Sequence, residues 1–140
     1  MFVDRSLGTG SVVDALRSVD AAVIGELKIH DDMFPQDTDD EVWLVSCGDN
    51  RWVGITKDKL RESPTEREAI KSAKAAVFRI SAAKLSGPAL GELIVKAMPL
   101  IRKALRRFHP PLLVTLTASG GANVMIGNGE DFKPYKALKP

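Results

Sequence analysis

The sequence predicts an α/β domain with a mostly parallel central sheet, flanking helices and a C-terminal β-hairpin. Short apolar runs typical of strands alternate with segments whose apolar residues recur at helical spacing. Helix start signals recur between these runs, and the last two apolar runs flank a Ser-Gly-Gly turn. With 140 residues, 44% of them hydrophobic, the chain can bury one core, so we expect a single domain over residues 1–140.

The chain begins with a predicted strand and helix. Phe2 and Val3 form a short strand, and after a glycine turn Ser11 caps a helix. The apolar positions of that helix are Val12, Val13, Leu16 and Val19. Residues 22–29 resemble a second strand, although Gly25 makes this segment ambiguous, and they lead into the polar stretch HDDMFPQDTDDE.

A second helix is predicted from about Asp40 to Gly48. Thr38 or Asp39 can cap its start, and Gly48 can end it. We expect its buried side to carry Val42, Trp43, Leu44 and Val45. The run RWVGIT at 51–56 is then the next strand.

The second half of the chain repeats the alternation. Ser63 caps a helix that begins at Pro64, and 75–80 form a strand. A long helix over 87–108 contains Pro99, which should bend it. Two apolar strands around the turn SGG then form a hairpin at one edge of the sheet, and 132–140 read as a flexible tail.

Charge is unevenly distributed along the chain. Residues 1–56 carry 11 acidic and 4 basic side chains, and 57–140 carry 7 and 16, so the two parts have net charges of −7 and +9. This separation suits metal ions and a polyanion meeting on one protein, although solvated helix faces explain it equally well. The single cysteine, Cys47, can form no internal disulfide, and the sequence has no apolar run long enough for a membrane span and no signal peptide. We therefore expect a cytoplasmic protein.

Four acidic side chains stand at comparable places in the pattern. Asp4 follows the first strand, Asp58 follows the strand at 51–56, and Asp40 and Glu41 open a helix. Because ligands bind outside the carboxyl ends of the strands in such sheets, we expect these carboxylates to gather there. Oxygen ligands of this kind suit Mg²⁺ or Mn²⁺, which activate water for phosphodiester hydrolysis. Each acid could instead cap a turn or favour a helix start.

The order of the motifs resembles a known family. DRSLG is followed by HDDMFPQDTDDEVWL, WVGITKDKLRESPTERE and a long helix ending in FHPP. This order resembles that of the VapC-type PIN-like domains, a family of small toxin ribonucleases. The resemblance covers residues 2 to about 117. It implies a PIN-like fold, Mg²⁺- or Mn²⁺-dependent endoribonuclease activity, a cognate antitoxin and a homodimer.

The resemblance also assigns roles by position. Asp4 matches the aspartate of the first strand, Asp40 and Glu41 match the acidic pair, and Asp58 matches the aspartate of T-K-D, with Thr56 as the preceding hydroxyl. Asp4, Asp40 and Asp58 are the expected metal ligands, and all four acids are the expected catalytic residues. A further acidic residue that many PIN domains carry downstream has no clear counterpart here.

Basic side chains near Asp58 would hold RNA. We expect the RNA phosphate to contact four residues: Thr56, Lys57, Lys59 and Arg61. A second basic cluster ends the long helix and is either a solvated face or a contact for an acidic antitoxin segment. Its members are Arg102, Lys103, Arg106 and Arg107.

Three other interpretations stay open. The chain could be a catalytically inactive PIN-like module that binds RNA or a protein, or, less well supported, a phosphoacceptor receiver domain. His30 could be a metal ligand or general base, but a lone histidine at a strand end is more often structural. The glycines of LGTGSVV do not complete a dinucleotide-binding loop. We expect Cys47, Trp43 and Trp52 to pack in the core.

Overall fold

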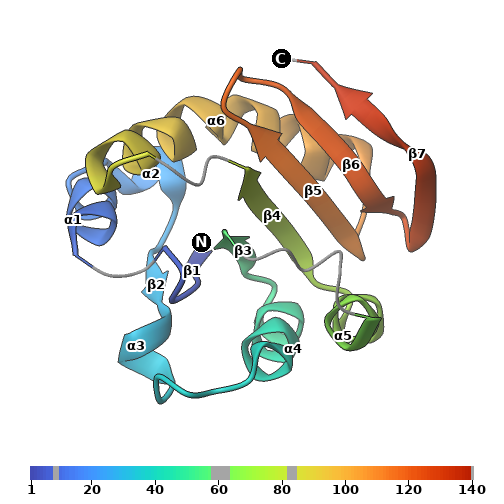
Figure 1. Cartoon of the computed structure of the whole chain (residues 1–140), viewed down its shortest axis with the longest axis horizontal. Coiled ribbons are helices and arrows are strands. Elements are labelled where there is room, and N and C mark those ends of the chain that lie inside the picture. The colour runs from blue at the N-terminus through green and yellow to red at the C-terminus, as the bar shows by residue number, and fades with distance from the viewer. Residues whose placement is uncertain (8–9, 58–63, 82–84, 140) are drawn as a thin grey trace.

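The computed structural model describes residues 1–7, 10–57, 64–81 and 85–139. Within these ranges the chain forms a seven-stranded sheet with the order β2-β1-β3-β4-β5-β6-β7 (Figure 1). The strands are β1 (Phe2–Val3), β2 (Lys28–Ile29), β3 (Val53–Thr56), β4 (Ala76–Ser81), β5 (Leu112–Thr117), β6 (Ala122–Gly127) and β7 (Glu130–Leu138). The strands from β2 to β5 pair in parallel, and β6 and β7 continue the sheet in antiparallel pairs. The predicted fold class is confirmed.

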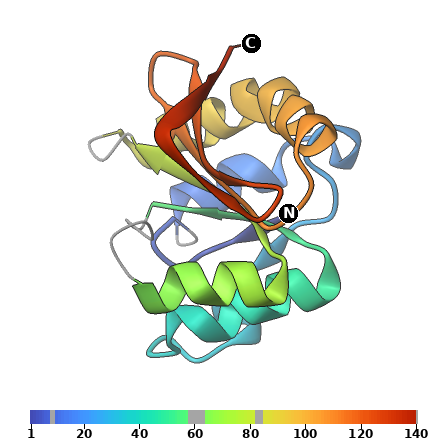
Figure 2. The same cartoon turned by 90° about the vertical axis from the view of Figure 1, so that its right-hand side faces the viewer.

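Helices cover both faces of the sheet (Figure 2). They are α1 (Ser11–Arg17), α2 (Ala21–Ile24), α3 (His30–Met33), α4 (Asp40–Asn50), α5 (Pro64–Ala73) and α6 (Gly87–Arg107). On one face, the apolar sides of α1 and α6 pack on Val3, Ile55, Phe78 and Val114 of the sheet. On the other face, α4 and α5 pack on Phe2, Val77, Leu113 and Ile126. Alternate strand residues therefore serve different cores, as the period of a strand requires.

Helix α4 is longer than predicted, and its buried side is narrower. Gly48 does not end the helix, which continues to Asn50 and terminates at Arg51 in the left-handed conformation (φ 56°). Gly48 is needed for packing instead, because a Cβ there would lie 2.2 Å from the carbonyl oxygen of Ala73 at the end of α5. Val42 and Val45 are 47% and 42% exposed, since only Trp43, Leu44 and Cys47 of α4 face the sheet.

The predicted strand at 22–29 is wrong over most of its length. Asp20 caps the short helix α2 by accepting a hydrogen bond from the backbone N–H of Ala22 (2.9 Å). Gly25 then turns the chain with a positive φ of 75°, which leaves only Lys28 and Ile29 to pair with β1. The cap and the turn residue thus outweigh the apolar run between them.

The C-terminal hairpin is present, but it does not form the edge of the sheet. β5 and β6 pair antiparallel, and β7 follows β6 as the outermost strand. Residues 132–138 are therefore strand rather than flexible tail. Pairing with β6 and the burial of Leu138, which is 2% exposed, hold this segment in place. None of the helices in the described ranges is long and apolar enough to cross a membrane.

Candidate active site

A row of polar side chains crosses the sheet at the carboxyl ends of its parallel strands. The register pairs Thr56 of β3 with Arg79 of β4, and Arg79 with Thr115 of β5. Asp4 and His30 directly follow Val3 and Ile29, which pair with each other in the preceding row. These five residues are the buried polar or charged ones in the described part of the chain. Asp4, Arg79 and Thr115 lie two positions beyond Phe2, Val77 and Leu113 of the core that α4 and α5 cover, so they belong to that face of the sheet. Thr56 joins them through its pairing with Arg79.

The carboxylate of Asp4 is held by hydroxyl groups on one side. Its Oδ2 accepts hydrogen bonds from Ser6 Oγ and from Thr56 Oγ1, both at 2.8 Å. The backbone N–H of Lys57 donates to Ser6 Oγ at 3.0 Å, which fixes that hydroxyl in turn. Oδ1 forms no hydrogen bond with any described residue. Asp4 is only 2% exposed, so the orientation of its carboxylate is set by these contacts.

Asp40 is held in a similar way at the start of α4. The indole Nε1–H of Trp43, one helical turn on, donates to Asp40 Oδ1 at 2.9 Å. Trp43 is fully buried and stacks on Phe2, with ring centroids 5.4 Å apart. Within the described residues, the second oxygen of Asp40 also forms no hydrogen bond. The first turn of the helix favours the charged carboxylate.

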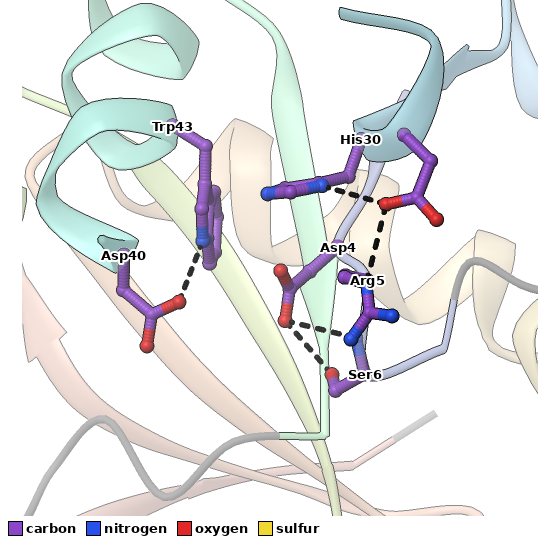
Figure 3. A network of polar contacts seen from close by, with 7 residues as sticks. Asp4, Arg5, Ser6, His30, Asp40 and Trp43 are labelled. Atoms are coloured by element: carbon purple, nitrogen blue, oxygen red, sulfur yellow. Dashed lines mark hydrogen bonds and ion pairs between the residues drawn. The ribbon is translucent and has the colours of Figure 1, made fainter. Parts of the chain in front are cut away.

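Asp4 and Asp40 line one cavity. Figure 3 shows the Asp4 and Asp40 carboxylates with the Trp43 indole and the His30 ring above them. The cavity has a volume of about 250 Å³ and is lined by Asp4, Arg5, Ser6, His30, Gln36, Thr38 and Asp40. This is room for several water molecules or for a phosphate group with water.

A second polar chain borders the cavity. His30 Nδ1 lies 3.0 Å from Asp31 Oδ1, and Arg5 Nε lies 3.5 Å from the same oxygen. The His30 ring is 2% exposed and packs against Phe2 and Phe34, with ring centroids 6.3 and 5.5 Å away. The imidazole is therefore fixed on the side of Asp31, and its other nitrogen, Nε2, lies on the opposite side of the ring.

The remaining predicted residues differ in how they relate to the cavity. Glu41 is half-buried in the first turn of α4 but does not line the cavity. Thr56 contacts Asp4 with its hydroxyl, and Lys57 is half-buried directly after it. Asp58, Lys59 and Arg61 lie outside the described residues.

The donors that are present fit a hard divalent cation. Among the residues that the structure describes, Asp4 and Asp40 each keep one carboxylate oxygen without a hydrogen-bond partner, and both line the same cavity. Oxygen ligands are those that Mg²⁺ and Mn²⁺ prefer. In the ranges that the structure describes, no three His, Cys, Asp or Glu side chains gather closely enough to hold a metal. Mg²⁺ usually keeps several water ligands and is held by one or two protein carboxylates, a number that Asp4 and Asp40 provide.

Three polar side chains were missed in the sequence: Ser6, which lies beside the row, and Arg79 and Thr115, which belong to it. Ser6 stands two residues after Asp4, a spacing at which a hydroxyl can bond a carboxylate locally, so an Asp-x-Ser pattern was an available signal. Arg79 lies among apolar residues of β4, where its burial depends on neighbouring strands. Cys47 is fully buried, and burial raises the pKa of its thiol to about 12, so it is a packing residue and not a nucleophile.

The fold is an α/β domain with two carboxylates on a cavity at the carboxyl ends of its parallel strands, and comparison with known proteins shows its family. The pattern of the PIN like domain family matches residues 1–82, and the chain belongs to that family. A Mycobacterium tuberculosis protein named "Putative ribonuclease VapC45" is 25% identical over 120 residues, which are 85% of this chain and 86% of that protein. No solved structure matches the chain significantly.

Proposed function

We propose that this protein is a metal-dependent endoribonuclease and the toxin of a toxin–antitoxin system. The observation that carries the proposal is the placement of Asp4 and Asp40 on one cavity at the carboxyl edge of the sheet, each with one oxygen open. Membership of the PIN-like family and the name of the mycobacterial relative support a ribonuclease. The partners that we propose are RNA and a cognate antitoxin, in the cytoplasm, with a homodimer as a further prediction.

Each side chain has a proposed role. Asp4, Asp40 and Asp58 would hold Mg²⁺ or Mn²⁺, and Glu41 would add negative charge beside them. Bound there, the metal would lower the pKa of a water molecule and stabilise charge on the phosphate. The hydroxyls of Ser6 and Thr56 bind Oδ2 of Asp4 and so orient its carboxylate with Oδ1 pointing away from them. The indole N–H of Trp43 binds Oδ1 of Asp40 and orients that carboxylate in the same manner. Lys57, Lys59 and Arg61 would hold the RNA backbone.

A second candidate is a catalytically inactive PIN-like module that binds RNA or a protein. It is favoured by the finding that no three metal-ligating side chains gather in the described ranges. The two candidates differ in metal affinity, because a binding module has no need of a cation between Asp4 and Asp40. They also differ in RNA cleavage.

The test is cleavage of a labelled mixed RNA by the pure protein with Mn²⁺, Mg²⁺ or EDTA, beside calorimetric titration with Mn²⁺. Asp4→Asn, Asp40→Asn and Asp58→Asn should each lower cleavage by about 10²-fold or more and weaken Mn²⁺ binding, while the proteins stay folded. Asp49→Asn is the matched control, because Asp49 is exposed near the other end of α4. Equal cleavage by all variants in EDTA would refute the metal site. Absence of both cleavage and Mn²⁺ binding in the wild type would favour the binding module.

A further inference from the structure

His30 has the features of a catalytic base in this cavity. Its ring is 2% exposed, yet only one of its nitrogens has a hydrogen-bond partner among the described residues. Nδ1 faces Asp31, while Nε2 has none. Figure 3 shows the unpartnered end of the ring pointing toward the space between Asp4 and Trp43. Since His30 also lines the cavity, Nε2 is open to a molecule bound there.

The surroundings of the ring fix its tautomer. The Asp31 carboxylate accepts a hydrogen bond best from Nδ1–H, which leaves a lone pair on Nε2 in the neutral ring. Arg5 approaches the same Asp31 oxygen and holds the carboxylate in place. Phe2 and Phe34 pack against the ring and prevent it from turning. This arrangement of a carboxylate, an imidazole and an open Nε2 is the one that orients histidine bases in enzymes.

We propose that His30 is the general base of the hydrolysis, a step that rests on the proposed nuclease function. A water oxygen in the cavity attacks the phosphorus of the RNA backbone, and one proton of that water passes to Nε2 of His30. As the new P–O bond forms, the bond from phosphorus to the leaving ribose oxygen breaks, and that oxygen keeps the electron pair and takes a proton from solvent. His30 then releases its proton to solvent, which restores the neutral ring.

The charged groups around the cavity suit this role. In the described part of the chain, the titratable side chains that line it with His30 are Asp4, Arg5 and Asp40, and Asp31 lies behind the ring. Asp31, which is not a proposed metal ligand, pairs with the imidazolium that forms when the proton arrives. A histidine that served only packing would need neither the Asp31 contact nor an open nitrogen on the cavity.

One readout requires no activity. The chain has two histidines, so a ¹⁵N-labelled sample gives two imidazole patterns, and His109→Gln assigns them. We expect the neutral His30 ring to carry its proton on Nδ1, and Asp31→Asn to weaken that preference. A ring protonated on Nε2 in the wild type would overturn the proposal, whether or not the protein cleaves RNA.

The activity readout compares His30→Gln and Asp31→Asn with His109→Gln, the exposed histidine. His30→Gln should lower kcat by about 10²-fold or more and remove the acid-side inflection of the pH–rate profile, with Mn²⁺ and RNA affinities unchanged. Asp31→Asn, an exposed position that leaves the core intact, should lower kcat less, and His109→Gln should have no effect. If His30→Gln kept the kcat and the pH profile of the wild type, the proposed role of His30 as a base would be wrong. It would also be wrong if kcat fell only because the variant unfolds or releases the metal. If the wild type cleaved no RNA, the proposed nuclease function would be wrong. The NMR measurement of which His30 nitrogen carries the proton would then still test the inference about His30.

Discussion

The two ends of the sheet, taken in strand order, are stabilised in different ways. β1 and β2, which lead into Asp4 and His30, have two residues each, whereas β5 and β6 have six and β7 has nine. Asp4 is fixed by side-chain hydrogen bonds from Ser6 and Thr56, while the C-terminal strands form long ladders over an apolar core. We call the first the site region (β1–β3, α3 and α4) and the second the ladder region (β4–β7 and α6).

The contrast indicates a division of work. Long ladders and apolar packing stabilise most of the ladder region, in which Arg79 and Thr115 are the buried polar side chains that the structure describes. The site region buries charged and polar side chains, which is favourable only if each finds a partner. Changes in the ladder region should therefore act on stability alone, and changes in the site region on the carboxylates first.

The largest effect is expected in the ladder region. Ile94 of α6 is fully buried on the face opposite the candidate site. Ile94→Ala should lower the free energy of unfolding by about 2–5 kcal/mol, because it leaves a cavity in the core. Denaturant unfolding measures this, and Mn²⁺ affinity per folded molecule should not change. Lys96→Ala, at an exposed position of the same helix, is the control. A loss of Mn²⁺ affinity in folded Ile94→Ala would contradict the expectation that changes in the ladder region act on stability alone.

A smaller effect is expected from Thr56→Val in the site region. Valine keeps the shape of the side chain but removes the hydroxyl that donates to Asp4, and a hydrogen bond to a charged group contributes about 1.5–3 kcal/mol. We expect a loss of stability near the lower end of that range and weaker Mn²⁺ binding, since Oδ2 then keeps only the Ser6 donors.

Thr115→Val is the matched control for that change. Thr115 lies in the same row, but its hydroxyl donates to the sulfur of Met125 at 3.4 Å and not to a carboxylate. Denaturation and Mn²⁺ calorimetry on both variants separate the effects. If the two changes weakened Mn²⁺ binding equally, the hydroxyl of Thr56 would have no special role in orienting Asp4.

In the site region, the positions of two predicted side chains follow from local signals. The strand-end rule and the helix start predicted that Asp4 and Asp40 would lie at the same edge of the parallel sheet, and both line one cavity there. Glu41 is adjacent to Asp40 in α4, but neighbouring helix residues point in different directions, and it does not line the cavity. The hydrogen bond from Thr56 to Asp4 could not be predicted from the sequence, because the two residues meet only through the register of β1 and β3.

In the ladder region, the prediction of a flexible C-terminal tail was wrong for a similar reason. Residues 132–138 mix apolar and basic side chains without a regular alternation and contain Pro134, so no local pattern indicates a strand. Their structure depends on pairing with β6 and on the packing of Leu138 and Phe132 against the core. Such long-range contacts decide the state of a segment whose own propensity is weak.

The smallest effect concerns the ion pairs that tie β7 to α5. Asp131 receives hydrogen bonds from Lys71 Nζ (2.6 Å) and from Arg67. The hydrogen bond from Lys71, together with that from Arg67, holds the pKa of Asp131 below its ordinary value, although partial burial acts in the opposite direction. A carboxyl whose pKa is lower in the folded state stabilises the fold above its unfolded pKa, and this contribution is lost as the pH falls through the folded pKa.

Asp131→Asn should therefore reduce stability at neutral pH and leave it unchanged in acid, so that the two stability curves converge as the pH falls. Because the Asp131 side chain is 37% exposed, we expect a difference of less than about 1 kcal/mol, smaller still in high salt. Urea unfolding between neutral and acidic pH measures it, with Asp49→Asn as an exposed aspartate without an ion pair in the described chain. A difference that persisted in acid would mean that Asp131 acts through packing. A larger effect than that of Thr56→Val would mean that ion pairs, and not ladders alone, hold β7 on the sheet.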